Sequence, residues 1–514
     1  MQFPVWGSSL LSAVTALLSV AQFTWSPGGD TFVPAHRLTG IGVDRASISD
    51  AVLARRTELM IDTQTFSIMR DPQALAGAKR ITSPKLQKIF DNAAKQSGLP
   101  ASLISAVAYL ESWGDPNAES PAGPKGVMQI AHATARSMGL KIVTARKYRV
   151  SKERRAVKGR RGKVTYKTVR IKTPYTVVVR DERASPEKAI PAAARYLARM
   201  QDKFGGIDWA VFAYHCGEGC VGEFQEMVRR SRGMGDGQPT VARAFFSANP
   251  AYNRELYELI RHHMDRDFSP TYWFRIMKAQ KLLALYQEDP DQFEKLIVEY
   301  RNQENPLIRA PHRLAVWLKE PDVMYKTCDD IRRDSGKRLV KAFDDPDRFG
   351  FRLRKSGSGA IGELDISNQD SYLEATPAAI GTLAYIAFET RRLHEAMKPK
   401  GEKFVPLDVT GLVRTLDYQQ RVFNRAVAAR SELAAHCTGQ VFDIALTNLP
   451  AGEREALQFV LDDMGWDGYL GFVEEHPNSG LLHIGCSPSA RDFFTDVFED
   501  ALGKNKDKAA RAAE

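Results

Sequence analysis

Apolar residues recur at helical spacing along much of the chain and predict where its helices lie. Leu103, Ile104, Val107 and Leu110 fall on one face of such a segment, which predicts a helix packed into a core. The same spacing recurs from about 239 to 304, where prolines separate the periodic stretches. Helices are therefore expected on both sides of an intervening segment that has a different pattern.

That intervening segment, about 141–183, alternates apolar and charged positions instead. The alternation in 163–172 and 176–180 predicts a β-hairpin. The segment holds 16 Lys and Arg against three acidic residues, and such a block of like charge is either solvated or used for contact. The hairpin is therefore expected to be a solvated flap or a surface that docks on an anionic wall or membrane.

Glu111 lies at the last turn of the apolar helix, next to buried surface. Desolvation there should raise the pKa of its carboxyl group and keep it protonated for general-acid catalysis. A lone glutamate in this position more often ends a core helix and faces water. The residues that follow Glu111 decide between these interpretations.

Two blocks of sequence resemble the signature of the lysozyme-like lytic transglycosylases. The first joins Glu111-Ser112 to a Gly/Pro/Ser-rich turn with Ser120-Pro-Ala-Gly, and ends at Gly126-Val-Met128-Gln129. The second is Ala213-Tyr214-His215-Cys216-Gly-Glu-Gly, with His and Cys where the family usually has Asn and Ala. The resemblance covers about 80–230 and implies an all-α lysozyme-like domain at 75–235, with 141–183 as a basic insertion.

This resemblance implies cleavage of the β-1,4 bond between N-acetylmuramic acid and N-acetylglucosamine in peptidoglycan. Glu111 would be the sole acid and base, no cofactor would be needed, and the muramyl 6-hydroxyl would close a 1,6-anhydro product. Most glycosidases use two carboxylates, and Asp115 and Glu119 are the nearby candidates for a second. Asp115 precedes proline and is typical of a turn, and the resemblance implies no nucleophile at either position. A true muramidase that hydrolyses the same bond is the alternative. The residues implied to bind, orient or underlie the substrate are Ser112, Ser120, Met128, Gln129 and Tyr214.

A third group of residues near the C-terminus has the composition of a metal site. His436 and Asp443 are seven residues apart, and His483 follows on a predicted strand. Two imidazoles and a carboxylate can hold zinc as three protein ligands with an open fourth position. Upstream, Arg414 is placed where it could clamp a substrate carboxylate.

Together these segments resemble the zinc D-Ala-D-Ala peptidases and murein endopeptidases. The resemblance implies an α+β domain at 306–502, a zinc ion on His436, Asp443 and His483, and action on stem peptides. Gly480 and Leu481 stand where many members carry the catalytic Glu or a His. Glu474, Glu475 and His476 in the preceding loop are the candidates to replace the missing base; without one, the domain would be a non-catalytic wall-binding module.

The composition and the N-terminal segment indicate which partners and which cellular location to expect. The 514-residue chain is 43% hydrophobic with a net charge of +10 and a pI of about 9.2, which favours anionic partners such as wall polymer or lipid head groups. No nucleic-acid recognition motif is present, so nucleic acid is not expected. The apolar run 10–21 is typical of a signal peptide, or of an uncleaved anchor, within 1–21. A periplasmic, secreted or other cell-envelope location follows.

The expected organisation is a multidomain wall-remodelling protein. A helical connector at 236–305 joins the two enzymatic domains, and 503–514 is a charged tail. Its partners would be glycan strands and stem peptides, and a scaffold protein with vestigial sites is the alternative. Among the five cysteines, Cys216 and Cys220 could form one disulfide and Cys437 and Cys486 a second, with Cys328 left over.

Overall fold

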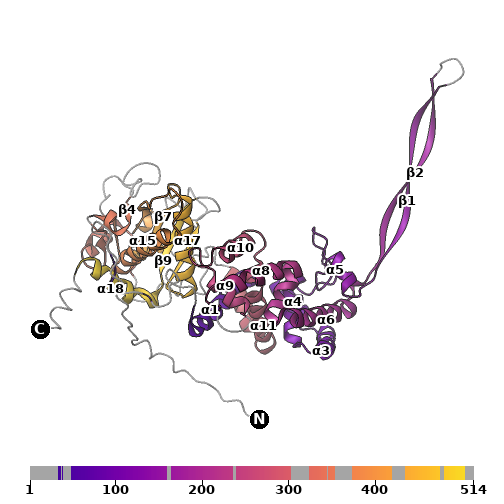
Figure 1. Cartoon of the computed structure of the whole chain (residues 1–514), viewed down its shortest axis with the longest axis horizontal. Helices are drawn as coiled ribbons and strands as arrows, with labels where there is room; N and C mark the ends of the chain where they lie inside the picture. The colour runs from indigo at the N-terminus through magenta and orange to yellow at the C-terminus, as the bar shows by residue number, and fades with distance from the viewer. Residues whose placement is uncertain are drawn as a thin grey trace, which may run out of the picture.

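The computed structural model describes the chain in two helix-rich parts linked through packed helices (Figure 1). It describes residues 33–35, 38, 48–158, 164–234, 239–301, 323–343, 345–353, 373–418, 435–474 and 480–503. The predicted signal peptide or anchor at 1–21 and the tail at 504–514 lie outside these residues. The described part of the chain contains no helix that is long and apolar enough to cross a membrane.

The first part is helical, apart from one hairpin. Its helices are α1 (Asp50–Met69), α2 (Ala74–Ile81), α3 (Pro84–Ser97), α4 (Ala101–Ser112), α5 (His132–Ser137), α6 (Pro186–Phe204), α7 (Ile207–Cys216), α8 (Glu218–Arg230), α9 (Val241–Ser247), α10 (Arg254–Met264), α11 (Tyr272–Glu288) and α12 (Pro290–Arg301), with short 3-10 turns η2 (Glu182–Ala184) and η3 (Ser269–Thr271). Proline at the start of α3 and α6, and a left-handed glycine after each, mark their ends as local sequence predicts.

Helix α4 occupies the centre of this part. Eight of its twelve residues are buried, and α3, α2 and α11 pack around it. The segment 236–305, expected to be a connector, thus contributes α11 to the same core as α4. This packing brings the start of α11 beside the end of α4.

The predicted hairpin is present and long. Strands β1 (Ile142–Lys158) and β2 (Val164–Asp181) pair antiparallel along their whole length, with one irregularity after Val143. The ribbon projects away from the helices (Figure 1). It enters and leaves the helical body between α5 and η2.

The second part is an α+β unit around a five-stranded sheet. Its elements are α14 (Cys328–Asp334), β3 (Val340–Lys341), η4 (Pro346–Phe349), β4 (Phe351–Leu353), β5 (Glu374–Ala375), α15 (Pro377–Met397), β6 (Leu407–Gly411), η7 (Ala435–Thr438), β7 (Val441–Ala445), α17 (Ala451–Trp466), β8 (Leu470–Glu474), β9 (Leu481–Cys486), η8 (Pro488–Ala490) and α18 (Arg491–Ala501). The strand order is β4-β6-β7-β9-β8, antiparallel except for β4 and β6. The buried helix α15 packs against α17, α18 and the sheet.

Contacts between α1 and α17 join the two parts. The guanidinium group of Arg56, which is fully buried, forms ion pairs with Asp463 and Asp467 at 2.7 Å each. Phe245 and Phe246 of α9 pack on the ring of Trp466 at the end of α17. A buried ion pair and an aromatic cluster therefore fix the second part against the first.

One predicted disulfide forms and the other does not. Cys216 and Cys220 are bonded across the junction of α7 and α8. Cys437 and Cys486 are separate buried thiols, so the second predicted pair was wrong. Cys486 lies three positions after His483 on β9, so its side chain faces the opposite side of the sheet from the His436 cluster.

Candidate functional site

Glu111 lies at the C-terminal turn of α4, where the helix ends against the first motif loop. The carboxyl group is partly buried, and Tyr272 at the start of α11 donates a hydrogen bond to its Oε1 atom at 2.5 Å. Burial raises the pKa of Glu111 to about 7, although the Tyr272 hydrogen bond and the positive charge of Arg275 both lower it. Desolvation outweighs these two effects, so much of the Glu111 population is protonated at neutral pH.

Tyr272, Arg275 and His215 are the site residues that sequence reasoning missed. Tyr272 is buried, and its ring stacks on the imidazole of His215, with centroids 4.4 Å apart and planes 11° apart. In the sequence, His215 is visible only as a departure from the family pattern. Tyr272 follows Glu111 by 161 residues, and the only local signal was an aromatic run after the Pro270 turn.

The loop after α4 is built by the residues predicted to line the groove. Ser112 is buried, and its hydroxyl group donates to the carbonyl oxygen of Val127 at 2.8 Å. Gln129 has a left-handed backbone, and its amide donates to the carbonyl oxygens of Ala118 and Gly126. These two side chains thus brace the loop beside Glu111; their predicted role in substrate binding stays a prediction.

The remaining predicted groove residues also take part in loop structure. The hydroxyl group of Tyr214 donates to the carbonyl oxygen of Met128 at 2.7 Å, which ties the second motif to the first. The Met128 side chain is fully buried beneath the loop, and Ser120 accepts a hydrogen bond from the backbone of Ala122 at 3.3 Å. The two sequence blocks therefore meet in space around Glu111, as the resemblance implied.

The base of the hairpin is fixed to the same loop. Arg183, which is buried, pairs with Asp181 at the end of β2 and donates to the carbonyl oxygens of Gly123 and Ile130 at 3.0 Å each. Gly126 lies so close to this segment that a Cβ atom would overlap the carbonyl of Arg183, and its φ of 81° also favours glycine. Loop and ribbon base thus form one packed unit.

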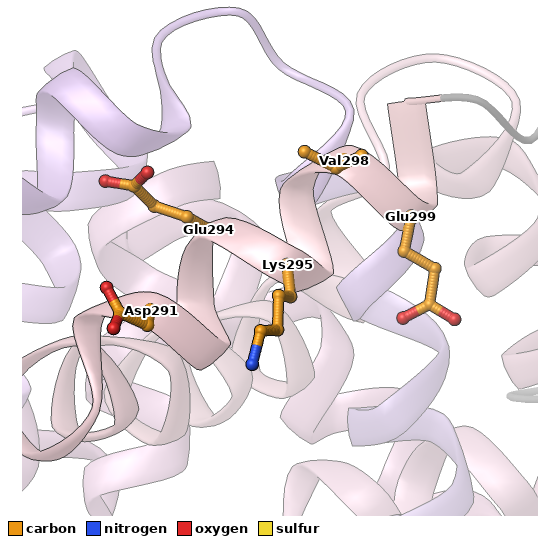
Figure 2. A pocket seen from close by; sticks show the side chains of 5 residues that line it. All are labelled: Asp291, Glu294, Lys295, Val298 and Glu299. Carbon is orange, nitrogen blue, oxygen red and sulfur yellow. The ribbon is translucent and has the colours of Figure 1, made fainter.

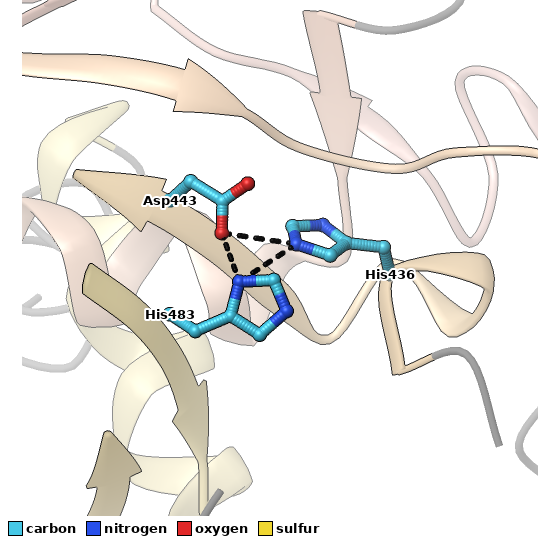
Figure 3. A group of neighbouring side chains, drawn as sticks. All are labelled: His436, Asp443 and His483. Atoms are coloured by element: carbon cyan, nitrogen blue, oxygen red, sulfur yellow. Dashed lines mark hydrogen bonds and ion pairs between the residues drawn. The ribbon is translucent and has the colours of Figure 1, made fainter. Parts of the chain in front are cut away.

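The C-terminal candidate site brings together the three predicted ligands (Figure 3). Asp443 on β7 is directly opposite His483 on β9 in the register of the sheet, and His436 approaches from η7. The Nε2 atom of His436 lies 3.0 Å from Oδ1 of Asp443 and 3.3 Å from Nδ1 of His483, and Oδ1 also contacts Nδ1 of His483. All three residues are buried.

This donor set fits zinc. Two imidazole nitrogens and one carboxylate oxygen lie within 4.8 Å of one another, which is the ligand chemistry that zinc prefers. The Nδ1 atom of His436 lies 2.7 Å from the carbonyl oxygen of Leu412, so it is expected to carry the proton and leave Nε2 free to bind a metal. Burial lowers the pKa of His436 to about 4, which keeps it neutral.

The surroundings of Asp443 hold its carboxylate in place. The guanidinium group of Arg414 forms an ion pair with Oδ2, the oxygen that faces away from the two imidazoles. Nearby His436, His483 and Arg414 lower the pKa of Asp443 against the opposing effect of burial. The guanidinium group of Arg414 thus lies on a predicted ligand, and its predicted role as a substrate clamp stays a prediction.

The general base of this site is not identified among the described residues. Glu474 at the end of β8 accepts a hydrogen bond from the backbone of Gly480 at 3.0 Å, so it closes the turn before β9. Glu475 and His476 lie outside the described residues. A separate hollow on α12 is lined by Asp291, Glu294, Lys295, Val298 and Glu299, none of which belongs to either candidate site (Figure 2).

Comparison with known proteins agrees with the first site. Residues 88–155 and 165–233 match the model of the Transglycosylase SLT domain, and the gap between them includes the end of β1 and the start of β2. The predicted resemblance of this part of the chain to lytic transglycosylases is thereby confirmed. The matched residues end before the His436 cluster, so the resemblance to zinc peptidases stays a prediction.

Similar proteins occur in a phage and in bacteria. The chain is 32% identical over 138 residues to the peptidoglycan transglycosylase gp16 of Escherichia phage T7, covering 27% of this chain and 8% of the relative. It is 28% identical over 181 residues to the membrane-bound lytic murein transglycosylase F of Alcanivorax borkumensis, covering 34% and 30%. The corresponding protein of Salmonella paratyphi A is 26% identical over 251 residues, covering 46% and 40%. The chain thus spans less than half the length of each relative.

Proposed function

We propose that this protein is a lytic transglycosylase that cuts the bond between N-acetylmuramic acid and N-acetylglucosamine in the peptidoglycan of the cell envelope. The observation that carries the proposal is the partly buried, Tyr272-bonded carboxyl group of Glu111, with a pKa raised to about 7, at the meeting point of both family motifs. The similarity to named peptidoglycan and murein transglycosylases supports it.

In this mechanism Glu111 acts first as an acid and then as a base. Its proton passes to the glycosidic oxygen as the bond to the muramyl anomeric carbon breaks. The 2-acetamido group of the substrate stabilises the positive centre that forms. The Glu111 carboxylate then takes the proton of the muramyl 6-hydroxyl group, whose oxygen closes the 1,6-anhydro ring. Tyr272 would hold the carboxylate in place between these two steps.

The test is mass spectrometry of purified peptidoglycan after digestion with the wild-type protein and with Glu111→Gln. We expect muropeptides with 1,6-anhydro ends that are absent with the variant. Free reducing muramic acid in their place would identify a muramidase, because a hydrolase adds water to the same carbon. An intact polymer in both digests would favour a wall-binding scaffold.

A second activity, zinc-dependent cleavage of stem peptides, is favoured by the cluster of His436, Asp443 and His483. These three residues would hold the ion, and zinc bound there supplies Lewis-acid polarisation of a peptide carbonyl and activation of water. Arg414 would keep the Asp443 carboxylate oriented. The C-terminal part would otherwise be a non-catalytic wall-binding module.

Metal content and product analysis test this second activity separately. We expect about one zinc per chain in metal-replete protein and its loss in His436→Ala. His394→Gln is the matched control, since His394 is a buried histidine of the same part outside the cluster. Stem peptides shortened by the wild type but not by His436→Ala would establish a peptidase. Zinc binding with intact stems would indicate a metal site without this activity.

A further inference from the structure

The hairpin is a long structural feature that the proposed reaction does not use. Its strands of 17 and 18 residues extend roughly 55 Å at about 3.3 Å per residue. Most of the described side chains along it are exposed, including Tyr148, Tyr166 and Tyr175. A two-stranded ribbon with no core of its own gains little stability from folding, so this length is better explained by a contact with another molecule.

Positive charge covers both faces of the ribbon. Side chains directly opposite in an antiparallel pair lie on the same face, so the strand register assigns each cation to one side. One face carries Arg146, Lys152, Arg154, Arg170 and Lys172, and the other carries Lys147, Arg149, Arg155 and Lys167. Glu153 and Asp181 are the sole acidic residues in the sequence from 142 to 181.

Cations on both faces favour an anionic partner that can contact both faces at once. A planar membrane presents its anionic groups to one face of a ribbon and leaves the cations of the other face in water. A polymer network can surround the ribbon and offer counter-charges to both faces. Peptidoglycan has this form, because peptide stems bearing carboxylates project from glycan strands in several directions.

We propose that the hairpin enters the peptidoglycan network and pairs on both faces with the carboxylates of the stem peptides. The inference rests on the proposed function, which supplies the polymer. Arg183 joins the ribbon base to the loop beside Glu111 through Asp181, Gly123 and Ile130. A ribbon held among the stems therefore keeps the neighbouring glycan strand close to the Glu111 carboxyl group, which raises its effective concentration there.

The experiment measures binding separately from cleavage. Full-length Glu111→Gln protein is sedimented with purified sacculi, at low and high salt, with its ribbon unchanged or with one or both faces neutralised by Lys→Gln and Arg→Gln changes. We expect each single-face variant to bind more weakly, and the double variant to lose about 10-fold or more in affinity at low salt. The loss should disappear on glycan whose stems have been removed by an amidase.

A control that removes four cations elsewhere, as many as the face with Lys147, Arg149, Arg155 and Lys167 carries, separates the effect of the ribbon from that of overall charge. Lys88, Lys95, Arg195 and Arg199 are exposed cations on α3 and α6, and their change to glutamine should leave sacculus binding within about 2-fold of the unchanged ribbon. In protein that retains Glu111, neutralising the ribbon should leave cleavage of a short soluble glycan unchanged. If Glu111 protein cleaves nothing while binding still depends on ribbon and stems, the proposed function fails and this inference stands.

Three results would overturn the inference. The first is equal sacculus binding with and without the ribbon charges. The second is dependence on one face alone, together with binding to phosphatidylglycerol vesicles as tight as to sacculi, which would identify a membrane surface. The third is tighter ribbon-dependent binding to double-stranded DNA than to sacculi.

Discussion

The hydroxyl group of Tyr272 donates a hydrogen bond to Oε1 of Glu111, which joins the start of α11 to the end of α4. The carboxyl group is otherwise in a desolvated position that favours its neutral form. A hydrogen bond to the charged form works in the opposite direction, so Tyr272 limits how far the Glu111 pKa rises. Tyr272 is therefore a positioning residue, and its removal should raise the pKa of Glu111.

Tyr272→Phe should slow glycan cleavage about 10-fold and move the alkaline limb of the pH–rate profile to higher pH. The shift follows because the variant loses a donor that stabilises the Glu111 carboxylate. A merely structural role would lower the rate without moving the limb. Tyr286→Phe is the matched control on the same helix, and it should change neither the rate nor the profile.

The raised pKa of Glu111 also predicts a stability effect that needs no substrate. A carboxyl group with a pKa of about 7 when folded and an ordinary value when unfolded stabilises the fold fully only below its unfolded pKa. That stability is lost as the pH rises through about 7. Glu111→Gln removes the ionisable group, so it should raise the free energy of unfolding relative to wild type by about 3 kcal/mol at pH 8 and by little at pH 4. Urea denaturation at the two pH values measures the difference, and an equal effect at both would contradict the assigned pKa shift.

The sequence predicts the first site in part because its motifs are local. The apolar spacing places Glu111 at the end of a buried helix, and burial of that helix end is what raises the carboxyl pKa. The role of Tyr272 cannot be predicted from the sequence. The hydrophobic periodicity indicates that a helix begins near Tyr272, but not which other helix this one packs against. The contact depends on the tertiary placement of α11 against α4.

At the second candidate site, too, the sequence predicts local features but not the tertiary contacts. The spacing of His436 and Asp443 suggests a ligand pair, and His483 joins them because the sheet register sets it opposite Asp443. The guanidinium group of Arg414, the predicted substrate clamp, forms an ion pair with Oδ2 of Asp443. The sequence does not predict that Arg414 pairs with Asp443, because no single segment determines the order of β6, β7 and β9 in the sheet.

Arg56 should be essential for stability, because it is the buried cation between Asp463 of α17 and Asp467, the residue that caps this helix. Replacing it with Met leaves Asp463 and Asp467 in a buried position, and removal of one partner from a buried ion pair costs about 3–5 kcal/mol. Arg55→Met is the matched control: Arg55 also pairs with Asp467, but its side chain is 46% exposed, so a loss below about 1 kcal/mol is expected. Urea denaturation measures the free energy of unfolding of both variants. Similar small losses of this free energy would show that α17 is not anchored through Arg56.

Gly411→Ala should weaken zinc binding although Gly411 is not a ligand. A Cβ atom at this position on β6 would overlap the carboxylate of Asp443 and the guanidinium group of Arg414, so the carboxylate must move away from the two imidazoles. Displacing a ligand or its orienting partner commonly costs about 10–100-fold in metal affinity. Gly465→Ala on α17 is the control, because its Cβ atom would meet its nearest neighbours only at 3.8 Å. Competition with a chelator measures the affinity of each variant, and wild-type zinc affinity in Gly411→Ala would mean that Asp443 does not ligate the metal.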